Sequence, residues 1–111
     1  MSYNTSLELR INDSIAGLEG VEIKKMFGGV GFLIHGKMFC GIHKDYLILR
    51  LSEDDALTAL EELVNSRPFD ITGRPMKGWV MVPPPGIPDD GLEFRMWISR
   101  TREFASSLPP K

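Results

Sequence analysis

Between Ile23 and Leu51 the chain reads IKKMFGGVGFLIHGKMFCGIHKDYLILRL. Three turn signals divide this segment: Gly28-Gly29, His35-Gly36 and the run from His43 to Asp45. Two-residue turns that contain glycine are the strongest local signal for a β-hairpin, because the turns that suit twisted strands need positive φ angles. The segment therefore predicts an antiparallel meander of four strands.

The spacing of the turns predicts which strand residues share a face of the sheet, because alternate side chains of a strand point to opposite sides. One face is apolar and is the predicted core face: Ile23, Phe27, Val30, Phe32, Ile34, Phe39, Leu47, Leu49 and Leu51. The opposite face carries Lys24, Cys40 and Arg50 together with a candidate interaction face, which consists of Met26, Leu33, Met38, Ile42, Tyr46 and Ile48. Because this second face is also apolar, we expect it to be covered either by a helix of the same chain or by a partner.

Helical periodicity frames the meander on both sides. Apolar residues at helical spacing predict a first helix over residues 6–19, a second from Ser52 to Asn65 and a third from Asp90 to Ser107. Residues 69–72 and 79–82 read as short strands separated by a loop, and the prolines that follow at 83–88 predict an extended connector. The expected order is α-ββββ-α-ββ-α, an α+β fold with helices segregated from a mainly antiparallel sheet.

Composition limits the class of protein. A chain of 111 residues with 42% hydrophobic and 25% charged residues is typical of one globular domain, so residues 1–111 are expected to form a single domain. No apolar run reaches the roughly 20 residues of a membrane span, and the first residues lack a secretory pattern. Cys40 has no second cysteine with which to form an intrachain disulfide. We expect a cytoplasmic protein that is not associated with a membrane.

Four short motifs go beyond the fold pattern. The meander contains KMFGGVG at residues 25–31, FCG at residues 39–41 and LILR at residues 47–50, and the later loop reads RPFDITGRPMKG at residues 67–78. Together they resemble the TfoX/Sxy N-terminal domain family, in the short stand-alone form found in many bacteria. The resemblance implies a two-layer sandwich like that of the secretion chaperones. It also implies kinship with regulators of natural competence, whose separate C-terminal domain is expected to be absent here, and it brings no catalytic residues.

Several patterns that suggest chemistry have simpler structural explanations. Gly28-Gly29-Val30-Gly31 leads into a strand, whereas a phosphate-binding loop leads into a helix. Cys40 and His43 are three residues apart and point to opposite faces of one strand, and His35 lies in a turn. Negative charge is favoured at helix starts, which accounts for Glu53, Asp54, Asp55 and Glu93. We expect no catalytic residue, no metal site and no cofactor.

These observations lead to one leading hypothesis and two alternatives. The candidate interaction face favours a non-enzymatic protein-interaction or regulatory domain, which binds a protein partner or itself as a homodimer. The first alternative is a transcriptional regulator that contacts nucleic acid through a basic patch of Lys24, Lys25, Lys37, Lys44 and Arg50. The net charge of −2 disfavours this alternative. The second alternative is an enzyme or binder of a small anionic ligand at the loop that carries Arg74 and Lys77.

Overall fold

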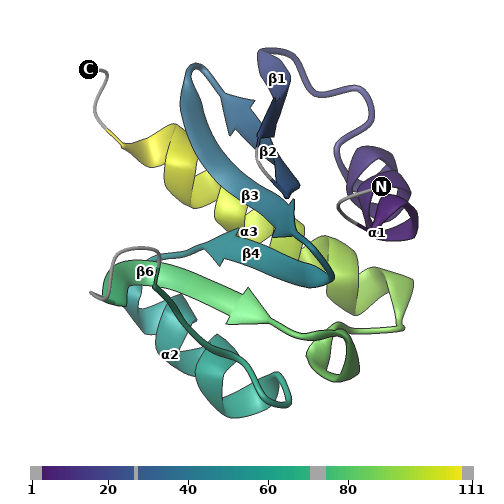
Figure 1. Cartoon of the computed structure of the whole chain (residues 1–111). Coiled ribbons are helices and arrows are strands. Elements are labelled where there is room, and N and C mark those ends of the chain that lie inside the picture. Colours follow the sequence, from purple (N-terminus) through teal and green to yellow (C-terminus); the bar gives the residue numbers. More distant parts are fainter. Residues whose placement is uncertain (1–3, 27, 71–74, 109–111) are drawn as a thin grey trace.

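The computed structural model describes residues 4–26, 28–70 and 75–108 of the chain. Over these residues the chain forms three α-helices and six strands in the predicted order α-ββββ-α-ββ-α (Figure 1). The helices are α1 (Thr5–Ser14), α2 (Glu53–Glu62) and α3 (Gly91–Ser107). The strands are β1 (Val21–Met26), β2 (Gly29–Ile34), β3 (Lys37–His43), β4 (Tyr46–Arg50), β5 (Arg67–Asp70) and β6 (Pro75–Val82).

The strands form one open antiparallel sheet. Within the described residues its order is β1-β2-β3-β4-β6-β5, so β6 and then β5 extend the meander of the first four strands. The β2–β3 turn has the predicted conformation, with φ angles of 49° at His35 and 80° at Gly36. Positive φ at both central residues defines a primed hairpin turn, which matches the twist of the flanking strands. The predicted α+β class is confirmed.

Three connecting segments differ from the prediction, and the first is the loop expected before residue 79, where β6 already begins at Pro75. The first helix ends at Ser14 and not at Glu19, because Gly17 adopts a positive φ of 87° that the helix cannot include. The proline-rich connector contains a 3-10 turn, η1 (Pro84–Gly86), and is not extended throughout. Prolines fit the first positions of a helical turn, because the N–H that proline lacks has no partner there.

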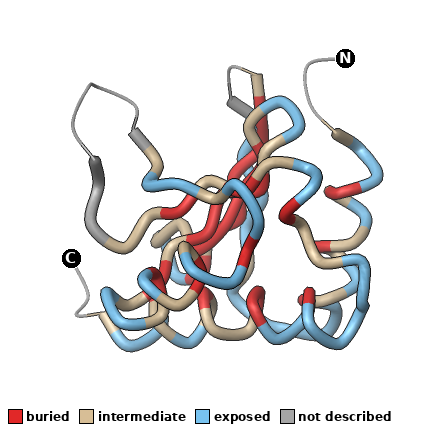
Figure 2. The backbone as a smooth tube through the Cα atoms, turned by 90° about the horizontal axis from the view of Figure 1, so that it is seen from below, coloured by how far each residue is buried: buried red, intermediate tan, exposed pale blue. Residues whose placement is uncertain are grey.

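The hydrophobic core lies between the helices and one face of the sheet, which we call the covered face. α3 passes behind β3 and β4 in the view of Figure 1, and α2 packs against β6. Buried residues are concentrated along the central strands and on the sides of the helices that face them (Figure 2). The largest contributors include Phe32 and Phe39 from the sheet, Ile11 from α1, and Trp97 and Ile98 from α3.

A β-bulge in β3 changes which side chains share a face. Met38 and Cys40 pair with consecutive residues of β2, so Phe39 between them is the extra residue. Strict alternation placed Cys40 and Ile42 on the face opposite Phe39. Because the extra residue reverses the alternation, Cys40 and Ile42 also lie on the covered face, where they are 0% and 3% exposed. The predicted position of Ile42 in the candidate interaction face is therefore wrong.

The two edge strands of the sheet differ in regularity. β5 has four residues, contains Pro68 and shifts its register with β6 between Pro68 and Asp70. β1 has six residues and pairs with β2 in one unbroken register from Val21 to Met26. Proline and bulges at a sheet edge hinder pairing with a further strand, and β5 carries both.

Candidate interaction surface

The face opposite the covered face, which we call the open face, is defined by cross-strand pairing. Directly opposed residues of an antiparallel sheet share a face. This rule places most of the side chains named below on the open face. Phe69 is added because its ring contacts that of Trp79, with 6.4 Å between the ring centroids. The set consists of Leu33, Met38, His43, Tyr46, Ile48, Arg50, Arg67, Phe69, Trp79 and Met81.

Ile48 shows that the open face has an apolar layer of its own. This residue is only 2% exposed, yet it lies outside the core cluster to which α1, α2 and α3 contribute their buried residues. Ile48 pairs with Gly41 on one side and Met81 on the other, and the methyl group of Met38 lies over Gly41. Of the predicted interaction face, the open face thus includes Leu33, Met38, Tyr46 and Ile48.

The other aromatic and apolar members of the open face are half-buried. Leu33, Met38, Tyr46, Phe69, Trp79 and Met81 all fall in this class. The helices direct their buried side chains to the covered face, so within the described chain the open face carries no helix. The alternative that a helix of the same chain covers this surface does not hold for the described residues.

Two arginines stack on aromatic rings of the open face. The Cζ atom of Arg67 lies 5.8 Å from the ring centroid of Tyr46, and that of Arg50 lies 5.4 Å from the centroid of Trp79. Arg50 also donates to the carbonyl oxygen of Met38 at 3.4 Å and lies 5.9 Å from the ring of Phe104 in α3. Arg50 therefore holds the end of the sheet against α3, whereas Arg67 is exposed.

The basic patch predicted from the sequence is divided among several surfaces. Lys24 and Lys25 are neighbours on β1, so their side chains point to opposite faces of the sheet. Lys37, at the start of β3, donates to the carbonyl oxygen at the C-terminal cap of α3. Lys44 lies in the turn beyond the other end of β3. Together with the position of Arg50, these placements leave no single basic surface made of all five residues.

Phe27 of the predicted core face and three predicted site residues fall outside what the structure describes. Arg74 is outside the described residues, and so are the side chains of Lys77 and Met26. The anion-binding loop at Arg74 and Lys77, and the place of Met26 in the interaction face, therefore stay predictions.

Cys40 and the two histidines do not form a reactive group. Cys40 is fully buried on the covered face, where desolvation raises the pKa of its thiol far above the ordinary value of 9.0. His43 lies on the open face opposite Tyr46, and His35 is exposed in the β2–β3 turn. Among the described residues, no three or more His, Cys, Asp or Glu side chains are grouped closely enough to hold a metal ion.

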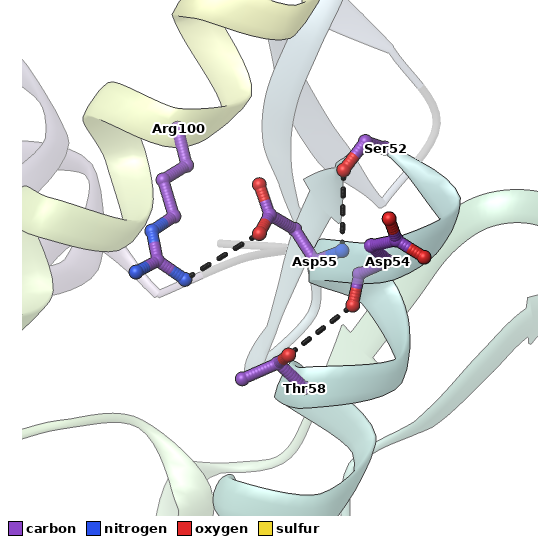
Figure 3. A network of polar contacts seen from close by, with 5 residues as sticks. All are labelled: Ser52, Asp54, Asp55, Thr58 and Arg100. Carbon is purple, nitrogen blue, oxygen red and sulfur yellow. Dashed lines mark hydrogen bonds and ion pairs between the residues drawn. The ribbon is translucent and has the colours of Figure 1, made fainter.

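The start of α2 is held by a cap and by an ion pair of Asp55 (Figure 3). The Ser52 hydroxyl caps the helix by accepting a hydrogen bond from the N–H of Asp55 at 3.1 Å. The Asp55 carboxylate then pairs with Arg100 of α3 at 3.6 Å, which links the two helices. This arrangement agrees with the interpretation of the carboxylates as helix-start residues.

The glycine run at residues 28–31 serves the packing of strands. Gly28 has a φ of 71° in the turn, and its carbonyl oxygen accepts a hydrogen bond from the N–H of Lys44 at 2.8 Å. A Cβ atom at Gly29 would collide with the carbonyl oxygen of Ile42 on the neighbouring strand. The run leads into β2, so it lacks the helix N-terminus on which phosphate-binding loops depend.

Half of the open face was not identified from the sequence. Arg67, Phe69, Trp79 and Met81 join it because β6 pairs with β4 and β5 pairs with β6, and His43 joins it because it pairs with Tyr46 beyond the bulge of β3. A signal was present in residues 79–82, where Trp79 and Met81 alternate with two valines that are buried on the covered face.

An α+β domain with an open antiparallel sheet and helices on one side is the class that this geometry defines. No helix in the described part of the chain is long and apolar enough to cross a membrane. The chain belongs to the TfoX N-terminal domain family, whose model matches residues 13–105. The resemblance inferred from the sequence motifs is thus confirmed. No curated protein and no solved structure matches the chain, so the likeness to secretion chaperones stays a prediction.

Proposed function

We propose that this chain is a non-catalytic interaction domain that binds a protein partner through the open face. The observation that carries the proposal is the residue content of a sheet face over which the described chain places no helix. Tyrosine, tryptophan, phenylalanine, methionine and arginine are the types enriched in the cores of protein interfaces, and the open face holds all five. The regulatory role implied by the family resemblance is part of this proposal.

The chemistry of the partner follows from one row of residues that crosses the whole sheet. Cross-strand pairing aligns the members of this row, which are Lys24, Gly31, Gly41, Ile48, Met81 and Arg67. The row is basic at both ends and small or apolar in the middle. The methyl group of Met38 lies over Gly41 in this row, and methionine side chains adapt to the shape of a ligand. A partner with an apolar segment flanked by acidic residues complements this surface.

The test compares two variants that each introduce a glutamate in place of an apolar residue. Met81→Glu alters the centre of the open face, whereas Leu57→Glu alters an α2 residue that is 60% exposed. The tagged protein and both variants are used to capture partners from native lysate treated with nuclease. We expect wild type and Leu57→Glu to retain the same specific protein and Met81→Glu to lose it. Equal capture by all three chains would refute binding through the open face.

A second candidate function is binding of single-stranded nucleic acid to the same face. The observation that favours it is the pair of arginine–aromatic contacts, Arg67 with Tyr46 and Arg50 with Trp79, on an open sheet. Sheets of this kind can stack bases on aromatic rings while basic side chains contact the backbone. The test is titration of a labelled oligonucleotide at several salt concentrations. Binding that weakens steeply with salt and falls further in Arg67→Gln supports this function; an absence of binding at low salt eliminates it.

A further inference from the structure

β1 ends the sheet with a regular and exposed edge. Glu22, Ile23, Lys24 and Lys25 are all exposed, and Ile23 remains 48% exposed although it pairs with the buried Phe32 of β2. A strand at the edge of a sheet presents a row of backbone N–H and C=O groups that can pair with another strand. An exposed isoleucine in the middle of such a row adds an apolar contact for the incoming strand.

We propose that β1 pairs with β1 of a second copy of this chain, antiparallel and centred on Ile23. The two-fold axis that relates two antiparallel edge strands runs perpendicular to the sheet, so opposed residues come from the same face. Centring on Ile23 then opposes Ile23 to its own copy, Glu22 to Lys24 and Val21 to Lys25. The symmetry repeats the Glu22–Lys24 pair, so the interface contains it twice.

Charge complementarity selects this register over its neighbours. Centring on Lys24 would oppose two lysines, and centring on Glu22 would oppose two glutamates. Like charges directly opposite each other destabilise a strand pair, whereas opposite charges stabilise it. In the register centred on Ile23 the aliphatic part of Lys25 also lies against Val21, which is half-buried at the rim of the core.

The dimer built in this way uses the edge of the sheet and leaves Met81 and its neighbours uncovered, so it shares only Lys24 with the row of residues proposed to bind a partner on the open face. A single pair of strands spanning residues 21–25 buries less surface than the roughly 1,200 Å² at which specific stable interfaces begin. We therefore expect a reversible dimer whose population rises with concentration.

Analytical ultracentrifugation of the whole chain, over roughly 1 µM to 1 mM, measures this equilibrium. Glu22→Lys sets lysine against lysine in both pairs, and Lys24→Glu sets glutamate against glutamate. Each variant is expected to weaken the dimer about tenfold or more. The double variant Glu22→Lys/Lys24→Glu restores opposite charges and should recover the wild-type equilibrium. An equimolar mixture of the two single variants should form a heterodimer, because each supplies the charges that the other lacks.

Both altered residues are exposed, so the variants are expected to fold, which circular dichroism checks. A wild-type chain that stays monomeric over the whole range overturns the proposal. If both single charge reversals dimerise as strongly as wild type, the proposal is overturned as well. If the double variant does not recover the wild-type equilibrium, the register is overturned. Met81→Glu should dimerise like wild type, so failure of the open-face proposal and failure of this one give different results.

Discussion

Replacing Cys40 with alanine is expected to lower stability at neutral pH and to remove a loss of stability at alkaline pH. The thiol is fully buried among core residues, so its removal leaves a small cavity. Such a truncation costs about 1 kcal/mol of unfolding free energy. The thiol has no charged form in the folded core at moderate pH, because burial raises its pKa far above the ordinary value of 9.0.

The sign of the pH effect follows from proton binding in the two states. Above the ordinary pKa of 9.0 the unfolded chain releases the thiol proton, while the folded chain keeps it. The unfolded state then binds fewer protons, so the stability of the wild type falls as pH rises above this value. At about pH 10 the loss is about 1.4 kcal/mol, which is enough to cancel the advantage of cysteine over alanine near pH 7.

Urea unfolding of wild type and Cys40→Ala near pH 7 and near pH 10 measures this difference. The other titrating groups are present in both chains, so their contributions cancel in the comparison. The reasoning predicts that the two chains differ near neutral pH and converge at alkaline pH. A difference that stays constant would mean that the Cys40 thiol ionises equally well in the folded and unfolded chains. That result would refute its burial and reopen the case for a reactive cysteine.

Three further predictions concern the helices and the two tryptophans. Ser52→Ala removes the cap of α2 and should lower the unfolding free energy by about 1 kcal/mol. Calorimetry should show this loss as a fall in Tm of about 4 °C. The control Thr58→Ala lies inside the same helix and should leave the unfolding free energy unchanged. Acrylamide should quench the fluorescence of Trp97→Phe, in which Trp79 remains, more steeply than that of Trp79→Phe, in which the buried Trp97 remains. Equal quenching of the two variants would contradict the assignment of faces. Arg100→Ala should lower the unfolding free energy by less than about 1 kcal/mol in urea, because its ion pair is half-exposed; a larger loss would show that the link between α2 and α3 matters more than its exposure suggests.

The meander was predictable because its information is local. Positive φ at His35 and Gly36 is a property of two adjacent residues, and the strands on either side of the turn must pair once it forms. The helix starts at Ser52 and Asp90 were predictable for the same reason, since each cap is a contact within three residues. Features of this kind depend on residues that are only a few positions apart in the sequence.

The β-bulge and the far side of the sheet were not predictable by the same means. Phe39 and Cys40 are both apolar, so the hydrophobic pattern does not reveal which of them is the extra residue. The pairing of β4 with β6 joins residues about thirty positions apart, and α2, which lies between the two strands in the sequence, packs against β6. Arg67 and Trp79 reach the open face only through this long-range pairing, so sequence reasoning identified β6 as a strand without placing its side chains.

The unequal edges of the sheet bear on how far association can proceed. A domain with two regular edges could add copies at both ends and grow into a fibre. In this chain the edge formed by β5 is short, contains Pro68 and is irregular, so it is a poor acceptor for a further strand. Pairing through β1 consumes the regular edge of each copy. Association of this kind is therefore self-limiting, and concentrated solutions should remain free of fibrils.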